Sequence, residues 1–359
     1  MRGTRMLCGF SFAFYMVLSG CTEPDRGASA GAALLAGDSV RLAESDTLYL
    51  GRPGDFSVDP RDGTFFVSDA FSGRIVNFDR NGALLASYGS KGDGPGEFRD
   101  AGEVVVMDSV VAAADDARGV FNLFDRGSGR YLGQQKYEGV LRFSALGAGS
   151  EVWLGAQSLQ SKTGVVRWDA TSGTSRRLVA LPREYVESQP IGGIFNGVFV
   201  APWADTLLVG FAGPGALRLV RPDGVLLDTV HVPAVRRLGV PTDFVERVKD
   251  LSFPEIFGSI SVLFDLRRLP DGRFAMVHYD QQIDKAGTVT SRVFLSLLSA
   301  DRRRACLDAE VPVGRSAQPK TAFRGDTLFV LDQVVHGDGA QTIVHSYTID
   351  DRPCDWIAL

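Results

Sequence analysis

The stretch DPRDGTFFVSDAFSGRIVNFDRNG, residues 59–82, decides the fold of this 359-residue chain. It begins with a tight polar turn, Asp59-Pro60-Arg61-Asp62-Gly63, and continues into the apolar strand Thr64-Phe65-Phe66-Val67-Ser68. It ends with a second polar turn, Asp79-Arg80-Asn81-Gly82. Gly, Asp and Asn supply the backbone conformations that tight hairpins need. The stretch therefore predicts consecutive strands joined by short turns.

Both signals recur along the chain. The apolar strand has copies at residues 64–68 (TFFVS), 109–113 (SVVAA), 151–155 (EVWLG), 205–209 (DTLLV), 273–277 (RFAMV) and 326–330 (DTLFV). The second turn recurs at residues 79–82, 125–129, 169–173 and 222–224, and more weakly at 299–301. Its glycines, Gly82, Gly129, Gly173 and Gly224, are separated by 47, 44 and 51 residues, enough for four strands and their turns. This is the period of a propeller blade.

An all-β, six-bladed β-propeller is the fold that these repeats predict. A unit of two hairpins cannot bury both faces alone, so neighbouring units stack, and closing the ring protects the sheet edges. We expect blades at about residues 55–100, 101–137, 138–182, 193–235, 258–314 and 319–359. An additional strand within residues 40–50 is expected to close the ring against the last blade, whose final segment would be residues 354–358.

The link after the first blade resembles a known family. The stretch Tyr88-Gly89-Ser90-Lys91-Gly92-Asp93-Gly94-Pro95-Gly96-Glu97-Phe98, followed by Glu103-Val104-Val105-Val106, is similar to the interblade link of NHL-repeat propellers. The similarity covers about residues 56–108. It implies membership of that broad superfamily, and a six-bladed ring.

The N-terminal segment resembles a bacterial lipoprotein signal. Arg2 and Arg5 precede an apolar run over residues 6–18, and Leu18-Ser19-Gly20-Cys21 is similar to a lipobox. The resemblance implies removal of residues 1–20 and acylation of Cys21; the alternative is an ordinary secretory signal with an incidental cysteine. Residues 21–38 are expected to be a flexible tether before a propeller over residues 39–359. Thr22 in place of aspartate favours the outer membrane, by resemblance to lipoproteins of diderm bacteria.

Charge and cysteine content bound the function further. Without residues 1–20 the chain has 36 basic and 43 acidic residues, so its net charge is −7. This acidic balance argues against nucleic-acid binding, which needs a basic surface. If Cys8 leaves with the signal and Cys21 is acylated, Cys306 and Cys354 remain. In an exported protein this pair predicts a disulfide, with two separate buried thiols as the alternative.

One segment interrupts the repeats between blades four and five. Residues 241–251 place Phe244, Val245, Val248 and Leu251 on one helical face, and Asp243 with Glu246 forms a candidate capping box. We expect a short inserted helix that covers one channel mouth or docks on the rim. Two roles stay open, a structural cap and a lid for a ligand or partner.

Catalytic motifs are sparse, and no catalytic residue is identified. The sequence has neither H-E-x-x-H nor G-x-S-x-G. Two loop clusters offer oxygen and imidazole ligands to a divalent cation: Asp332, His336 and Asp338, and His278, Tyr279, Asp280 and Asp284. Solvated acidic loops are the alternative interpretation. Resemblance to gluconolactonase-like propellers implies a channel calcium, and its candidate ligands here are Asp55, Glu103, Asn196 and Asp265. These groups could instead bind only channel water.

The sequence thus favours a non-enzymatic role. We expect a lipid-anchored propeller in the periplasm or at the cell surface that binds a small molecule or an envelope protein at its channel mouth or inserted helix, without a cofactor. The first alternative is a calcium-dependent hydrolase of the lactonase type, which needs carboxylates that converge on the channel. The second is an assembly subunit of a larger envelope complex that uses its outer blade edges.

Overall fold

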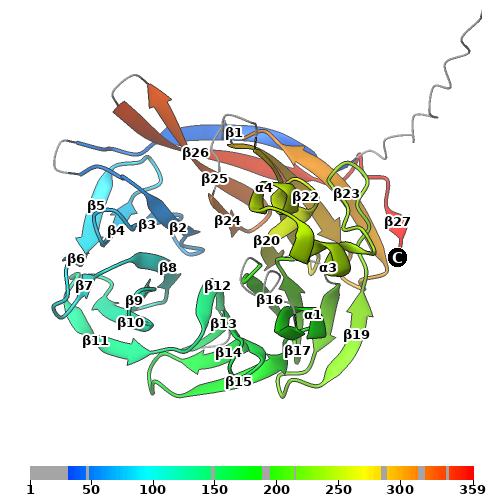
Figure 1. The fold of residues 1–359 in the computed structure, drawn as a ribbon. Helices are drawn as coiled ribbons and strands as arrows, with labels where there is room; N and C mark the ends of the chain where they lie inside the picture. Colours follow the sequence, from blue (N-terminus) through cyan, green and yellow to red (C-terminus); the bar gives the residue numbers. More distant parts are fainter. Residues whose placement is uncertain are drawn as a thin grey trace, which may run out of the picture.

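The computed structural model describes residues 31–45, 48–146, 150–187, 195–213, 216–283, 289–313, 320–336 and 339–359. Six antiparallel sheets surround a central channel, so the predicted six-bladed β-propeller is confirmed (Figure 1). The signal segment, with Cys21, lies outside the described residues. No helix in the described ranges is long and apolar enough to cross a membrane.

In blades one to five, four consecutive strands form a meander whose first strand lies next to the channel, whereas blade six takes its outer strand from the N-terminal part of the chain (Figure 1). Blade one contains β2 (Pro53–Val58), β3 (Phe65–Asp69), β4 (Arg74–Phe78) and β5 (Leu84–Tyr88). Blade two contains β8 (Ala101–Val106), β9 (Val110–Asp115), β10 (Val120–Asp125) and β11 (Tyr131–Lys136), and the link before it forms β6 (Ser90–Lys91) and β7 (Glu97–Phe98). Blade three contains β12 (Val140–Leu146), β13 (Glu151–Ser158), β14 (Thr163–Asp169) and β15 (Ser175–Ala180).

The remaining blades include strands from both ends of the chain. Blade four contains β16 (Val198–Trp203), β17 (Thr206–Phe211), β18 (Leu217–Val220) and β19 (Leu226–Val230). Blade five contains β20 (Ser261–Arg268), β21 (Phe274–Ile283), β22 (Val289–Leu298) and β23 (Arg304–Val311), with β27 (Ile357–Ala358) added outside. Blade six contains β24 (Lys320–Arg324), β25 (Thr327–His336), β26 (Gly339–Asp350) and β1 (Ala33–Arg41).

The repeated turn glycines have the backbone conformation that the sequence suggested. Gly82, Gly129, Gly173 and Gly224 all have positive φ values, between 71° and 93°. Side chains with a Cβ atom avoid this region, so glycine is the favoured residue at each of these hairpins. The glycine spacing therefore reports the blade period directly.

Aromatic side chains fill the spaces between blades. The ring of Phe121 in β10 stacks on Trp168 in β14 at a centroid distance of 4.6 Å. Tyr88 at the end of β5 packs edge to face on Phe124 in β10. Such pairs bury large apolar areas between neighbouring sheets and hold adjacent blades together.

Ring closure differs from the sequence prediction. The closing strand is β1, which pairs antiparallel with β26 from Ala33 opposite Asp350 to Arg41 opposite Ile343. It lies mostly within the segment expected to be a tether, and earlier than the predicted strand at residues 40–50. Most of its residues are exposed because it is an outer edge, so it has no alternating apolar pattern. Leu42, Leu48 and Leu50 instead pack into the core beside blade one.

The predicted disulfide is confirmed, although its setting differs. Cys306 in β23 is bonded to Cys354, with Cα atoms 5.7 Å apart. The prediction that residues 354–358 end blade six is wrong, since β27 pairs with β23 of blade five. The bond therefore holds the segment after blade six on the outer edge of blade five.

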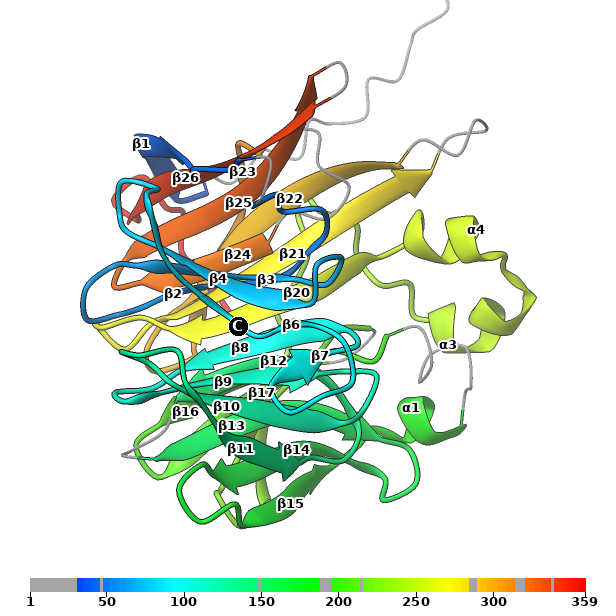
Figure 2. The ribbon, with the colours of Figure 1, turned by 90° about the vertical axis from the view of Figure 1, so that its left-hand side faces the viewer.

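The inserted helix between blades four and five is confirmed, with different details. The segment forms α3 (Phe244–Arg247), the 3-10 turn η1 (Val248–Asp250) and α4 (Phe253–Phe257). The Asp243 side chain makes no capping bond; the capping box is formed by Ser252 and Glu255. Helices α3 and α4 project from the same side of the ring as α1 (Arg183–Glu187) (Figure 2).

The insert docks on the rim above blade four. Phe244 is buried, and its ring lies 6.2 Å from that of Phe195, just before β16. Phe257 approaches the same ring to 5.6 Å. Val245, expected on the apolar face, is 39% exposed. Val248 and Ile256 are buried in the same core cluster, and α4 also contacts β21 of blade five.

Candidate functional site

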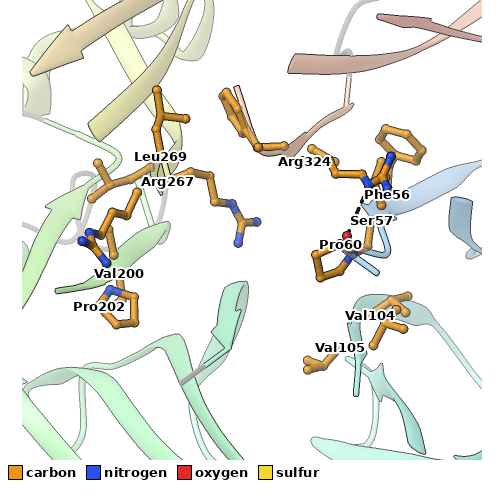
Figure 3. A pocket seen from close by; sticks show the side chains of 18 of the residues that line it. Phe56, Ser57, Pro60, Val104, Val105, Val200, Pro202, Arg267, Leu269 and Arg324 are labelled. Carbon is orange, nitrogen blue, oxygen red and sulfur yellow. Dashed lines mark hydrogen bonds between the residues drawn. The ribbon is translucent and has the colours of Figure 1, made fainter. Parts of the chain in front are cut away.

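A cavity of about 420 Å³ occupies the central channel. Its walls come from the inner strands β2, β8, β16, β20 and β24, and from the turns that follow them. Figure 3 shows the side chain of Arg267 extending into this space, whereas that of Arg324 lies beside Phe56 and Pro60 of blade one. The cavity thus brings together polar side chains from blades one, two, five and six, beside an apolar wall from blade four.

Bulges at similar positions shape the channel wall. The pairing of four inner strands with their neighbours shifts around Gly54 in β2, residues 102–103 in β8, Arg142 in β12 and Phe264 in β20. A bulge bends the strand and redirects nearby side chains. Asp55, Glu103, Arg142 and Asp265 all lie at or directly after these bulges, and of these four Asp55 and Glu103 line the cavity.

Asp55 forms hydrogen bonds with residues of two blades. Its backbone N–H donates to Ser68 Oγ at 2.7 Å, and its Oδ2 accepts the N–H of Val104 in the next blade at 2.9 Å. Burial raises the pKa of this carboxyl, while the backbone hydrogen bonds and the positive charges of Lys320 and Arg267 act in the opposite direction. Asp55 is therefore a structural link as well as a channel carboxyl.

The charges of Asp55 in blade one and Glu103 in blade two act on the pKa of Lys320. Lys320 begins β24, and burial lowers its pKa. The negative charges of Asp55 and Glu103 oppose this effect and raise the pKa of Lys320.

Asp265 is paired in the same way. Its Oδ1 accepts Nε of Arg267 at 2.9 Å, and its Oδ2 accepts the hydroxyl of Thr321 in blade six at 3.1 Å. Burial raises the pKa of Asp265, and the charge of Arg267 opposes this effect. The Arg267 guanidinium also lies 4.2 Å from the ring centroid of Phe143 in blade three, a cation–π contact across the channel.

The four candidate calcium ligands do not form one oxygen cage. Asp55 and Glu103 line the cavity, whereas Asp265 lies behind it and Asn196 is not part of its wall. Lysine or arginine charges act on the three carboxylates, and a calcium ion would have to compete with those cations. Across the described ranges, no group of three or more His, Cys, Asp or Glu side chains is arranged to hold a metal. This donor set does not fit the calcium centre that the family resemblance implies.

Neither loop cluster forms a cation site among the residues that the structure describes. Asp338 and Asp284 lie outside the described residues. His278 and Asp280 lie in β21, where Asp280 accepts hydrogen bonds from Ser261 Oγ at 2.6 Å and from the N–H of Leu238 at 3.1 Å. His278 instead lines a second cavity, between blades four and five.

Two arginines missed by the sequence analysis stand at the channel mouth. Arg268 and Arg324, the last residues of β20 and β24, are exposed and line the cavity. Arg324 Nε donates to the carbonyl of Pro60 at 3.3 Å, and neither guanidinium forms an ion pair with a described residue. The available signal was an arginine just before the inner hairpin turn in two repeats, Arg268 before Pro270-Asp271-Gly272 and Arg324 before Gly325.

Comparisons with known proteins support the fold. No family model matches the sequence, and no curated protein matches it. A member of the DUF4221 family from Bacteroides vulgatus has a similar structure, with a TM-score of 0.64, 9% identity, and coverage of 90% of this chain and 99% of that one. A putative exported protein from Bacteroides fragilis has a TM-score of 0.60 at 11% identity, covering 89% and 95%. Virginiamycin B lyase from Staphylococcus aureus has a TM-score of 0.50 at 11% identity, covering 88% and 99%.

Proposed function

We propose that this chain is a lipid-anchored, extracytoplasmic propeller that binds an anionic group, carried by a small molecule or an envelope protein, at its central channel. The observation that carries the proposal is the pair of exposed guanidinium groups, Arg268 and Arg324, at the mouth of a preformed cavity. Arginine presents several donors in a planar fork that fits carboxylate and phosphate groups. A rigid ring supplies the preorganisation that such recognition requires.

An extracytoplasmic location is supported by the disulfide. Structural disulfides persist in oxidising compartments and are rare in the cytosol, and Cys306 is bonded to Cys354. The similar Bacteroides fragilis protein is itself described as exported. The lipobox-like residues 18–21 support acylation at Cys21.

A relationship to NHL-repeat propellers is part of this proposal. The glycine-rich stretch that carries the resemblance forms the paired β6 and β7 between blades one and two. Gly89, Gly92 and Gly96 have positive φ values there, so the link depends on its glycines.

Lipid anchoring is tested by substitution of Cys21. Cells producing wild-type protein or Cys21→Ser are fed an alkyne fatty acid, fractionated, and assayed for label and location. We expect label and membrane association for the wild type only, since stable anchoring needs acyl chains. Equal membrane association of the two proteins would contradict the lipid anchor and leave channel binding untouched.

Channel binding is tested by calorimetric titration with citrate and with inorganic phosphate. Arg268→Ala and Arg324→Ala are each expected to weaken anion binding by about tenfold or more, the effect of losing a charge-assisted hydrogen bond. Arg80→Ala removes an equally exposed charge from the outer turn of blade one and serves as the matched control. Binding should also weaken as salt is raised.

The outcomes separate this proposal from the calcium enzyme. Anion binding that survives both channel substitutions, or that falls equally in Arg80→Ala, rejects the channel mouth as the binding site. Stoichiometric calcium binding to the chelated protein, abolished by Glu103→Gln, would favour the hydrolase alternative instead.

A further inference from the structure

We propose that a second cavity, between blades four and five, binds an organic cation, a small molecule with an apolar body and one ammonium group that pairs with Glu184. The site is separate from the central channel and does not rest on the anion binding proposed there. Its evidence is the construction of the cavity, its apolar walls and the sign of the charges in its lining.

The walls of this cavity suit an apolar ligand body. The cavity has a volume of about 770 Å³, within the range of small-molecule sites. Phe211 and Leu217 of blade four form one wall, and Leu263 and Met276 of blade five form the opposite wall. A methionine side chain adapts to ligands of different shape because it is unbranched and has three rotatable bonds.

The outer wall is the connecting strap, which we define as residues 231–242 between β19 and α3. Asp308 in β23 accepts Nε of Arg237 at 3.0 Å. Asp280 in β21 accepts the backbone N–H of Leu238 at 3.1 Å. Both aspartates are buried, so the strap is fastened to blade five from inside the fold. The cavity that it borders is therefore a built feature.

Glu184 of α1 is the acidic side chain in the lining, and the fold fixes its position. The next residue, Tyr185, is buried, and its hydroxyl accepts the backbone N–H of Gly213 in blade four at 2.6 Å. Glu184 itself is half-buried and forms no ion pair within the described residues. The arginine of the same helix, Arg183, pairs with Glu187 instead, at 2.7 Å. Glu184 therefore presents an accessible carboxylate to the cavity.

The other charges of the lining favour a cation as well. The guanidinium of Arg237 is neutralised by Asp308. Burial, followed by the positive charge of Arg237, lowers the pKa of His278 well below its usual value, so this imidazole is neutral. Leu359, the last residue of the sequence, also lines the cavity, and its carboxylate has the same sign as that of Glu184.

Two further basic side chains lie near the cavity without neutralising Glu184. His231 belongs to the lining but is exposed, so water and salt screen any charge on it. Arg218 lies outside the lining, donates to the carbonyl of Ala180, and has its guanidinium 5.4 Å from the ring centroid of Phe211. An ammonium group on a ligand would form a charge-assisted hydrogen bond with Glu184, whereas a ligand anion would be repelled.

The test compares 4-fluorobenzylamine with 4-fluorobenzyl alcohol by ¹⁹F NMR titration of the purified full chain at about pH 7.5, where the amine is protonated. The two probes share one ring and differ in the charge of the attached group. We expect the wild type to bind the amine about tenfold more tightly than the alcohol, the effect of a charge-assisted hydrogen bond. Added salt should weaken binding of the amine more than binding of the alcohol.

Two pairs of variants test the partner and the location. Glu184→Gln should weaken binding of the amine by about tenfold and leave binding of the alcohol nearly unchanged. Glu246→Gln is its control, because it removes an exposed carboxylate of α3 that does not line the cavity. Val240→Trp, at a lining residue, should abolish binding of both probes, whereas Val235→Trp, on the strap but outside the lining, should leave binding unchanged.

Thermal unfolding shows which variants are folded, and Glu184→Gln decides the question even if a tryptophan variant is not. Four results would overturn the proposal: no binding of the amine to the wild type, no preference for the amine over the alcohol, a preference that survives in Glu184→Gln, or binding that survives in a folded Val240→Trp. Each of them leaves anion binding at the central channel untouched.

Discussion

At the residue scale, the side chain of Asp308 accepts hydrogen bonds from Val235, Arg236 and Arg237, which lie between β19 and α3. Asp308 is fully buried, has a φ of 53°, and joins β23 to that segment. Its partner Arg237 is only 6% exposed in the side chain, so the pair is a buried ion pair. Removing one member of such a pair leaves the other charge buried and uncompensated.

Asp308→Asn should therefore be strongly destabilising. Asparagine tolerates the left-handed backbone, so the substitution removes the charge with little added strain. We expect a loss of about 3 to 5 kcal/mol in the free energy of unfolding, measured by urea denaturation. Glu138→Gln, which breaks an exposed pair with Arg177, should cost less than about 1 kcal/mol. Similar losses for the two variants would contradict the importance of burial.

His278 gives stability a pH dependence with a defined sign. Its pKa in the folded protein lies well below the reference value of 6.5. As the pH falls below about 6.5, the His278 side chain is protonated in the unfolded chain and stays neutral in the folded chain. The free energy of unfolding therefore decreases. Unfolding by urea at about pH 7.5 and about pH 5.5 should show a smaller acid-induced loss in His278→Phe than in the wild type. An identical loss in both proteins would rule out this contribution.

At the element scale, blades three and four approach more closely than side chains permit. A Cβ atom on Gly155 in β13 would lie 1.6 Å from the carbonyl oxygen of Val198 in β16. The contact is between backbones, so no side-chain rotation relieves it. The absence of a side chain at this position sets the spacing of two sheets.

Gly155→Ala should force these two blades apart. We expect a loss of about 3 kcal/mol or more in the free energy of unfolding, measured by urea denaturation, as in severe overpacking. Gly127→Ala is the matched control, because its Cβ would be 3.8 Å from the nearest atom. If Gly155→Ala and Gly127→Ala had the same free energy of unfolding, the blades could separate without loss of stability, which would contradict the prediction.

At the scale of the whole molecule, both ends of the chain return to the last two blades. β1 completes blade six, and β27 adds to blade five. The Cys306–Cys354 bond closes a loop that contains all of blade six except β1. A crosslink across so long a loop restricts the unfolded chain strongly.

Cys354→Ser should lower the free energy of unfolding by about 3 to 4 kcal/mol, by the loop-closure relation. Reductant should destabilise the wild type by a similar amount and leave Cys354→Ser unchanged, as followed by urea denaturation. A wild type indifferent to reductant would mean that the bond adds nothing to stability.

The fold was predictable from sequence where one physical requirement recurs. Glycines with positive φ at the outer hairpins of blades one to four, such as Gly82 and Gly224, gave the blade period. Cys306 and Cys354 were the only pair left once the signal and lipobox cysteines were assigned. Strand β1 escaped prediction because an exposed edge needs no apolar alternation.

The candidate site was less predictable because it depends on bulges and on contacts between distant blades. Asp55 and Glu103 were expected in the channel and do line it, but nothing in the nearby sequence indicated that their charges act on Lys320. Asn196 was expected at the start of an inner strand, yet it lies outside the cavity wall. Arg268 and Arg324 are more than 50 residues apart in sequence and meet at one mouth only through the ring.

The pairing of β1 with β26 also has a consequence for biogenesis. β1 leaves the ribosome, and crosses a membrane if the chain is exported, well before its partner β26, with the other blades in between. Blades one to four need only neighbouring strands and can form in order, whereas blade six must wait. During that interval an edge strand is available to other chains, which is a route to aggregation. A holding chaperone would therefore be of most use to this protein before its last hairpin arrives.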